Sequence, residues 1–392
     1  MIWPVKKLGD ILSTAEIFTD GDWVESKDQD VNGSIRLLQL ADIGDGNFIN
    51  KSNRFINEST FIRLKCTEVQ LGDILIARMP DPLGRACIFE GISQKCITVV
   101  DVCIIRVDSN IVDARWLMHA INNDSVRRQI SSFAKGATRV RISRKNLSHI
   151  QIEFPPLAEQ QRIAELLDTA DRILKQRESA IAKLDQLAQS VFVAMFSNIE
   201  HITTLSQVAE LKRGPFGGAL KKEIFVKHGP MVYEQRNAIY DDCKNGKYFI
   251  TEEKFNEMKD FSVTDNDLIV SCSGTLGKVA KIDKESPRGI INQALLRVRP
   301  KKNISSSFLK SAIESVSVQR NLAISSHGSG LQNFPPMAVV KAVPIPLPSF
   351  ELQLKFESIK EEILKKKIDL INSKNNLENL LKSLQHQSFA VN

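Results

Sequence analysis

The chain has 392 residues, of which 42% are hydrophobic and 25% charged, and its formal net charge is +7. These values are typical of globular proteins and exclude a disordered or fibrous class, and the length favours two or three domains. No apolar run approaches the roughly 18 residues that span a bilayer, and the N-terminal sequence MIWPVKKLGDIL lacks the apolar segment of a signal peptide. We therefore expect a soluble, cytoplasmic protein.

Residues 1–154 are predicted to form an α+β region with many short strands. The segments DILIARM, CIFEGI and ITVVDVCIIRV are rich in Val, Ile and Cys and are bounded by turn-forming residues. A helix is expected within residues 113–134. Residues 1–156 contain 20 basic and 19 acidic residues, but cations cluster near the end in RVRISRK, residues 139–145.

A long amphipathic helix is predicted over residues 163–195. Its apolar positions alternate steps of four and three, the heptad spacing of a coiled-coil seam, and Arg177 interrupts that seam. Pro155 and Pro156 exclude helix immediately upstream and set its start. At 1.5 Å per residue this helix would be about 50 Å long.

The second half of the chain follows the same plan. Residues 198–346 contain the strand-like segments DLIVSCS and GIINQALLRVRP, a predicted helix within residues 305–325, and a basic excess, with 21 basic and 14 acidic residues in 201–348. Such an excess fits an anionic partner such as DNA. A second heptad helix begins near Phe356, after Pro346 and Pro348, and Lys366 and Ser373 interrupt its seam.

An internal repeat links the two halves. PPLAEQQRI recurs as LPSFELQLKF, and one common offset matches Pro156, Glu159 and Gln161 to Pro348, Glu351 and Gln353, respectively. LGDILIARMPDPLGRA likewise resembles DNDLIVSCSGTLGKVA. We therefore expect the two long helices to pair with each other; the alternative is that each packs only on its own domain.

Catalytic and metal-binding motifs are incomplete. The six cysteines form no C-x-x-C pair and the histidines lie far apart, so neither a zinc site nor a disulfide framework is expected, and the thiols should be reduced and mostly buried. SGTLGKVA lacks the spacing of a phosphate-binding loop, and RGPFGG predicts a turn. NFPPM only approaches the N-P-P-aromatic loop of an adenine methyltransferase. Enzymatic activity is therefore not expected from this chain alone.

The arrangement of two strand-rich regions and two heptad helices with proline-marked starts resembles the specificity subunit of a type I restriction-modification system. The carrying segments are residues 154–196 and 346–384, together with LKRGPFGGALKK, GDILIAR, LIVSCSGTLGKVAKI and GATRVRIS. The resemblance implies target recognition domains at 1–154 and 198–346, separated by antiparallel coiled-coil helices at 155–197 and 347–392.

The same resemblance implies the function and the partners. Each domain would read one half of a bipartite double-stranded DNA target. The helices would dock two methyltransferase subunits, which bind S-adenosylmethionine and methylate adenine, and restriction or motor subunits can join. No cofactor is expected on this chain itself. Two alternatives stay open: a self-contained methyltransferase or restriction enzyme with an unrecognised catalytic site, and a coiled-coil adaptor that binds proteins.

Candidate DNA contacts are polar or cationic residues on predicted turns and strand ends, because such side chains read base edges and phosphates. They are Arg78, Arg85, Arg139, Arg141, Arg144, Lys145, Arg213, Gln235, Arg236, Asn237, Ser273 and Lys278. In the second copy the common offset places Leu331, Asn333, Pro336 and Met337 opposite the cations of RVRISRK. We therefore expect those cations to serve the first reading domain, and replacing Arg139 and Arg141 with alanine to weaken specific DNA binding.

Overall fold

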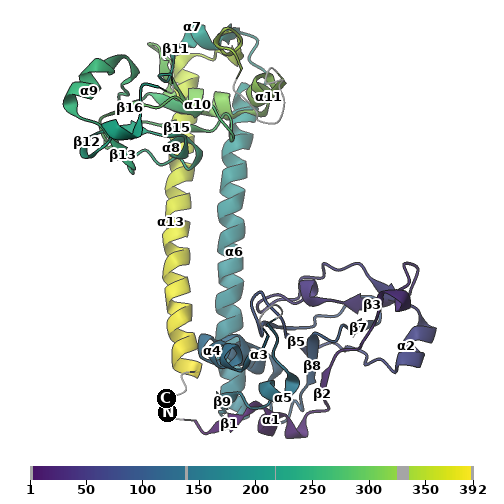
Figure 1. Cartoon of the computed structure of the whole chain (residues 1–392). Helices are drawn as coiled ribbons and strands as arrows, with labels where there is room; N and C mark the ends of the chain where they lie inside the picture. The colour runs from purple at the N-terminus through teal and green to yellow at the C-terminus, as the bar shows by residue number, and fades with distance from the viewer. Residues whose placement is uncertain (1–2, 137–139, 217, 325–334, 390–392) are drawn as a thin grey trace. The chain divides into compact units, whose positions relative to one another are not determined.

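A computed structural model of the chain describes residues 3–136, 140–216, 218–324 and 335–389 (Figure 1). The described residues fall into two compact units. The first unit combines Met1–Glu178 with Asn372–Asn392, and the second is Ser179–Ile371. Each unit therefore holds one strand-rich copy of the repeat together with part of both long helices. The finer four-part division expected from the sequence stays a prediction.

The first copy is built from short strands, helices and 3-10 turns. Its strands are β1 (Val5–Lys7), β2 (Ile17–Asp20), β3 (Ile35–Leu38), β4 (Phe55–Ile56), β5 (Ile74–Ala77), β6 (Ala86–Ile88), β7 (Cys96–Thr98), β8 (Val102–Arg106) and β9 (Gln151–Glu153). Its helices are α1 (Leu8–Ile11), α2 (Glu58–Leu64), α3 (Ala114–Asn122), α4 (Asp124–Phe133) and α5 (Arg144–Leu147), and its 3-10 turns are η1 (Leu12–Thr14), η2 (Ser26–Asp28) and η3 (Leu40–Asp42).

The second copy repeats the strands in the same order, whereas its short helices and 3-10 turns differ in part. Its strands are β10 (Ile202–Thr204), β11 (Ala209–Arg213), β12 (Val226–Tyr233), β13 (Tyr248–Phe249), β14 (Leu268–Ser271), β15 (Val279–Lys281), β16 (Gly289–Ile291), β17 (Leu295–Pro300) and β18 (Pro344–Pro346). Its helices are α7 (Leu205–Val208), α8 (Gln235–Ile239), α9 (Glu252–Glu257), α10 (Ser306–Glu314), α11 (Val316–Ile324) and α12 (Met337–Lys341), and its 3-10 turns are η4 (Lys222–Ile224) and η5 (Lys259–Phe261).

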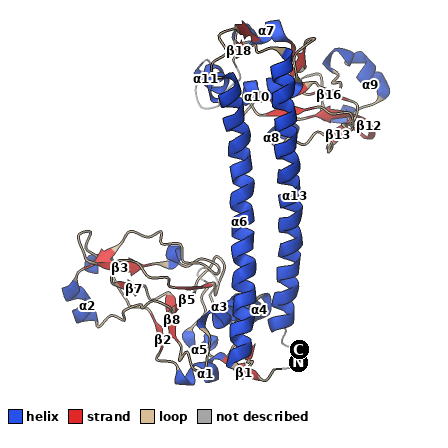
Figure 2. Ribbon diagram, turned by 180° about the vertical axis from the view of Figure 1, so that it is seen from behind, coloured by secondary structure: helices blue, strands red, loops and turns tan. Residues whose placement is uncertain are grey.

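Sheet topology confirms the repeat strand by strand. The antiparallel sheet β2-β8-β5-β6 of the first copy corresponds to β11-β17-β14-β15 of the second. The sheet β4-β3-β7 corresponds to β13-β12-β16, and in both the central strand pairs antiparallel with one neighbour and parallel with the other. The small pairs β1-β9 and β10-β18 also match. Figure 2 shows the strands of each copy in red, beside the helices that cover them.

Strands β5 and β14, each an inner strand of a four-stranded sheet, separate two hydrophobic cores in their domains. Every residue of β5 and of β14 is buried. Because successive side chains of a strand point to opposite faces, Ile74 and Ile76 enter the core beneath α3, whereas Leu75 and Ala77 enter a second core on the other face. In the second copy β14 divides its side chains in the same way. Burial on both faces accounts for the continuous apolar runs DILIA and DLIV in the sequence.

Two long helices follow the two copies. Helix α6 spans Leu157–Phe196 and α13 spans Phe350–Phe389, 40 residues each. Both begin about six residues before the predicted seams, directly after the proline-containing segments. The single helices predicted within 113–134 and 305–325 are each divided in two, because Asn123 and Ser315 adopt extended backbone angles.

The long helices pair antiparallel within each unit, which confirms the expected pairing. In the first unit the Arg177 guanidinium donates to the Ser373 carbonyl at 2.5 Å, and Lys374 forms an ion pair with Glu178 at 2.7 Å. Two of the three residues that interrupt the apolar seams, Arg177 and Ser373, therefore contact each other. In the second unit the Phe356 ring packs against Phe192 and Phe196, with centroids 5.6 and 5.3 Å apart.

The hydrogen bonds at the starts of α6 and α13 show how the two copies of the repeat align at this junction. Gln160 and Gln353 are both buried, and each donates to the carbonyl of the proline five residues earlier, Pro155 or Pro348. Pro155 is therefore the counterpart of Pro348. The offset inferred from the sequence, which matched Pro156 to Pro348, is wrong by one residue at this junction.

The sequence also led to expectations about membrane-spanning helices, cysteines and metal sites. Within the described ranges no helix has the length and apolar character needed to cross a bilayer. All six cysteines lie in the described part of the chain and are free and buried, as expected. Burial raises the pKa of Cys66 and Cys96 to about 11, so these thiols stay neutral at physiological pH. The described residues hold no cluster of His, Cys, Asp and Glu suited to a metal ion.

Candidate DNA interface

The turn between β14 and β15 presents candidate contacts in the second copy. Ser271 ties this turn to its own strand, because its Oγ donates to the Thr275 carbonyl at 2.6 Å and accepts from the Lys278 amide at 3.0 Å. The side-chain amide of Gln235, at the start of α8, donates to the Ser273 carbonyl. Ser273 and Lys278 are exposed on this anchored turn. The turn thus offers a hydroxyl and an ammonium group to an external ligand.

The corresponding turn of the first copy, between β5 and β6, is one residue longer and uses its cation differently. Arg85 occupies the position of Lys278 directly before the return strand, yet it is only 8% exposed. Its guanidinium donates to the carbonyls of four residues, Ile43 at 2.6 Å, Leu40 at 2.7 Å, Pro82 at 3.0 Å and Met79 at 3.2 Å. Arg85 therefore holds η3 and the turn together.

Arg78 lies at the other end of the same turn and is also internal. It is 3% exposed, forms an ion pair with Asp20 at 3.0 Å and donates to the Val100 carbonyl at 2.6 Å. Burial lowers the pKa of Arg78, and the negative charge of Asp20 opposes this shift. Because their donors are engaged inside the fold, burial argues against direct DNA contact by Arg78 and Arg85.

Part of the segment RVRISRK, residues 139–145, contacts the same loop as Arg78. Arg139 lies outside the described residues. Arg141 forms an ion pair with Asp101 at 3.2 Å and, like Arg78, donates to the Val100 carbonyl, at 3.3 Å. Arg144 donates to the Phe18 carbonyl at 3.0 Å. Lys145, on α5, is exposed. The structure therefore brings Arg78 and Arg141 together, and Lys145 faces solvent.

Helix α8 places the remaining candidates of the second copy. Arg236 is exposed, but Asn237 is 2% exposed and serves the turn that follows the helix. Its amide donates to the carbonyls of Asp242 at 2.7 Å and Asn245 at 2.8 Å, and its oxygen accepts from the Glu234 amide at 2.8 Å. Arg213, at the end of β11, is half-buried. DNA contact by the accessible candidates stays a prediction.

Two exposed aromatic residues were not among the predicted contacts. Phe216 follows β11 and is 96% exposed, and Trp23 follows the equivalent strand β2 and is 68% exposed. Each stands two residues after a glycine, Gly214 or Gly21. This shared spacing is visible in the sequence once β2 and β11 are aligned, but the alignment itself requires the strand pairing.

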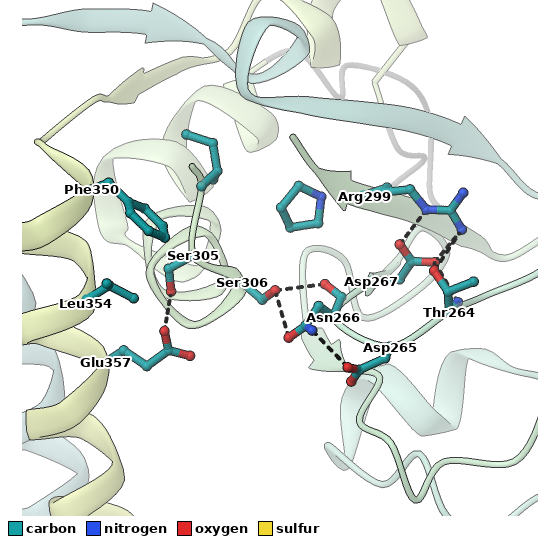
Figure 3. A pocket seen from close by; sticks show the side chains of 12 residues that line it. Thr264, Asp265, Asn266, Asp267, Arg299, Ser305, Ser306, Phe350, Leu354 and Glu357 are labelled. Carbon is teal, nitrogen blue, oxygen red and sulfur yellow. Dashed lines mark hydrogen bonds and ion pairs between the residues drawn. The ribbon is translucent and has the colours of Figure 1, made fainter. Parts of the chain in front are cut away.

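The joint between each copy and its following helix is made by a buried glutamine. The side-chain oxygen of Gln160 accepts from the amide of Asp113, the cap of α3, and that of Gln353 accepts from the amide of Ser305, the cap of α10, both at 2.9 Å. Beside the second joint lies a hollow of about 310 Å³ (Figure 3). Phe350 and Leu354 of α13 line it on one side, and the buried carboxylate of Asp267 lines it on another.

A comparison with known families matches both copies separately. The sequence pattern described as the type I restriction modification DNA specificity domain matches residues 2–183 and again residues 200–379. The chain belongs to this family. Each copy, with the adjoining part of its long helix, is therefore one specificity domain, and the resemblance noted in the sequence is confirmed.

Individual relatives agree with this assignment. The EcoBI specificity subunit of Escherichia coli is 24% identical over 201 residues, which cover 50% of this chain and 41% of that protein. The StySPI specificity subunit of Salmonella potsdam is 28% identical over 188 residues, or 44% of this chain and 39% of that one. The chain thus spans less than half the length of the curated relatives it matches.

A solved structure shares the fold over the whole chain. The specificity subunit of a type I restriction-modification system from M. genitalium superposes with a TM-score of 0.56 at 16% identity, covering 100% of this chain and 96% of that one. At this identity the likeness establishes the fold, and it confirms the expected α+β class with two specificity domains and two long helices.

Proposed function

We propose that this chain is the DNA-reading subunit of a type I restriction-modification complex. In this proposal each specificity domain reads one half of a bipartite target in double-stranded DNA. The observation that carries the proposal is the double match to the specificity family, together with the identical sheet order of the two copies. A duplicated reader fits a duplicated target, because two short recognitions on one chain add their binding free energies.

The chemistry is assigned to partner subunits. We infer that two adenine methyltransferase subunits, which supply S-adenosylmethionine, dock on this chain and are directed to the target, and that restriction subunits can join them. The sequence supports this division of labour, because its nearest approaches to a methyltransferase loop and a phosphate-binding loop are both incomplete. The names of the relatives EcoBI and StySPI, each a specificity subunit of a type I restriction enzyme, support a complex of this kind.

Charge supports DNA as the ligand of the second domain in particular. Residues 201–348 have 21 basic and 14 acidic residues, and Arg236 and Lys278 are exposed on elements that adjoin each other through Gln235 and Ser273. Neutralising phosphates releases counterions, so exposed cations of this kind increase affinity in a salt-dependent way.

Mapping methylated adenines in the genome, with and without this chain, tests the proposal. We expect a bipartite motif that loses methylation when the chain is removed and regains it when the chain is restored. Methyl transfer by the purified chain alone, measured with labelled S-adenosylmethionine, would instead establish a self-contained enzyme. An unchanged methylation pattern, together with no sequence-specific retention of DNA, would favour the protein adaptor.

A further inference from the structure

The loops after β2 and β11 occupy equivalent positions in the two specificity domains. In β2, Ile17 pairs with Arg106, and in β11, Glu210 pairs with the equivalent Arg299. Counting from these pairs makes Trp23 the counterpart of Phe216. We call residues 20–28 the first loop and the described residues 213–216 and 218–222 the second loop.

A glycine fixes the start of each loop. A Cβ atom on Gly214 would lie 1.8 Å from the Asn292 carbonyl oxygen, and one on Gly21 would lie 2.3 Å from the Val99 carbonyl oxygen. Any other residue would force the backbone away from its neighbour, so only glycine allows this close approach. The aromatic side chain two residues later therefore projects from a backbone that is held against the domain.

The far side of Phe216 is anchored as well. Its carbonyl accepts a hydrogen bond from the Ala219 amide at 2.9 Å, and Ala219 and Leu220 pack on the core that contains Ile250 and Phe255. The main chain is thus held before and after Phe216, while its ring is 96% exposed. A large apolar side chain in solvent on an anchored loop is typical of a contact site rather than of a core.

The two loops carry opposite charge. The second loop contains Arg213, Lys221 and Lys222 and no acidic residue, a net charge of +3. The first loop contains four acidic residues and one lysine, a formal net charge of −3. Two of these carboxylates, Asp20 and Asp28, are paired with arginines outside the loop, so the first loop is weakly acidic where the second is basic. The Trp23 indole also donates to Glu25 within its own loop, at 3.4 Å. An acidic loop is repelled by DNA phosphates, whereas a basic loop is attracted to them.

We propose that Phe216 inserts into the base stack of DNA in the half-site read by the second domain, with the cations of the second loop on the adjacent phosphates. Trp23 makes no such contact. This inference rests on the proposed function. Apolar side chains wedged between base steps are a recurrent way to bend DNA, and stacking on aromatic rings is tolerated by every base. A basic aromatic loop combines the two interactions that this insertion requires.

The test selects bound sequences from a pool of random DNA duplexes with the full chain. Four proteins are compared: the wild type, Phe216→Ala, Phe216→Trp and the matched control Trp23→Ala. The selected duplex is then made with 2-aminopurine at each position of the two half-sites in turn, because the fluorescence of this base rises when it is unstacked. Thermal unfolding of each variant checks that the exposed substitutions leave the fold intact.

We expect Phe216→Ala to bind the selected duplex roughly ten- to hundredfold more weakly and to lose the fluorescence rise in one half-site. Phe216→Trp should retain both properties, and Trp23→Ala should match the wild type. Equal binding and fluorescence for Phe216→Ala and the wild type would refute the insertion, as would an equal loss in Trp23→Ala. Release of a co-purified methyltransferase by Phe216→Ala, with DNA binding unchanged, would identify Phe216 as a protein contact instead.

If the wild-type chain enriches no sequence from the pool, the proposed function itself fails. A bipartite motif enriched equally by the wild type and Phe216→Ala keeps the proposed function and rejects the insertion alone. The two failures are therefore distinguishable in the same experiment.

Discussion

The two specificity domains share a scaffold and differ in the chemistry of their surfaces. Beneath the surface they keep the same ion pair between a buried carboxylate and a half-buried guanidinium, Asp73 with Arg106 at 2.8 Å and Asp267 with Arg299 at 2.7 Å. At the sheet end the charges differ, since Asp20 and the buried Arg78 of the first domain correspond to Arg213 and the neutral Cys272 of the second. Interior polar contacts are therefore common to both domains, whereas the charges at the sheet end and in the loops differ in sign.

In each domain the residues at the sheet end avoid an unpaired buried charge. An acidic partner compensates the charge of a buried guanidinium, and Arg78 has Asp20 at 3.0 Å. In the second domain, burial raises the pKa of Cys272 to about 12, against an opposing effect of the Arg213 charge. The neutral thiol needs no counter-ion, so the strand end can carry an arginine instead of an aspartate.

The largest expected effect tests the shared interior. Replacing Asp73 or Asp267 with alanine removes a carboxylate that is 1% exposed and breaks the ion pair with Arg106 or Arg299, which then keeps only neutral acceptors. Each change should lower the free energy of unfolding of its own unit by about 3 kcal/mol. Hydrogen exchange resolves the two units, and we expect the loss of protection to be similar in size and confined to the mutated unit. If only one of the two substitutions caused a loss of protection, the two ion pairs would not be equivalent.

A slightly smaller effect separates Arg85 from its counterpart. Arg85→Ala leaves buried carbonyls without their donor and should cost about 2–3 kcal/mol of stability. Lys278→Ala, the matched control, removes an exposed side chain and should change stability by less than about 0.5 kcal/mol. Urea unfolding measures both. Equal destabilisation by the two variants would contradict the structural role assigned to Arg85.

The stability of the first domain should depend on pH through Asp22, which has no acidic counterpart in the second domain. Burial raises the pKa of Asp22 to about 6 from its ordinary 3.8, against opposing hydrogen bonds from Thr67 and Cys66, while the second domain has Pro215 at this position. The folded state therefore prefers the neutral acid, and the stability that this group contributes below about pH 4 is lost as pH rises through 6. Asp22→Asn should be more stable than the wild type by about 2 kcal/mol at pH 7.

The advantage of Asp22→Asn should shrink as the pH is lowered from 6 to 4, which melting curves across that range would show. Glu25→Gln, a change to an exposed carboxylate in the same loop, is the control. A constant difference between Asp22→Asn and the wild type would show that the carboxylate of Asp22 does not titrate in this window.

The smallest effect concerns Lys278 and DNA. If its ammonium neutralises one phosphate, Lys278→Ala should reduce the slope of log affinity against log salt by about 0.9. Folded Arg85→Ala protein should keep the wild-type slope, because in the wild type the Arg85 guanidinium is bonded to internal carbonyls and contacts no phosphate. Binding isotherms at several salt concentrations measure both slopes, and an unchanged slope for Lys278→Ala would remove it from the interface.

Local patterns in the sequence predicted much of the fold. The heptad seams located both long helices, and the apolar runs located β5 and β14, because periodicity is a property of neighbouring residues. In the sequence, Arg177 and Ser373 interrupt the apolar seams of two different helices. Their contact depends on how the two helices align, which neither segment specifies by itself.

The candidate interface was less predictable because exposure is a tertiary property. Arg85 and Lys278 stand in similar sequence contexts, yet the first folds onto carbonyls and the second faces solvent. Asn237 resembles a base-reading residue in type, but it closes a turn. Phe216 was missed because a glycine-rich stretch predicts a turn without revealing which of its side chains stays in solvent.

The glutamine joint has an evolutionary consequence. Gln160 and Gln353 hold each domain through main-chain groups, an amide at a helix cap and a carbonyl of a proline. Backbone groups are the same in every sequence, so the two glutamine contacts place no demand on the side chains of the domain. Side-chain contacts supplement them, because Asp168 of α6 accepts from Arg115 and Glu357 of α13 accepts from Ser305. A foreign domain with the same capped helix could be recombined into this position with the glutamine contacts intact, and the host would acquire a new DNA address.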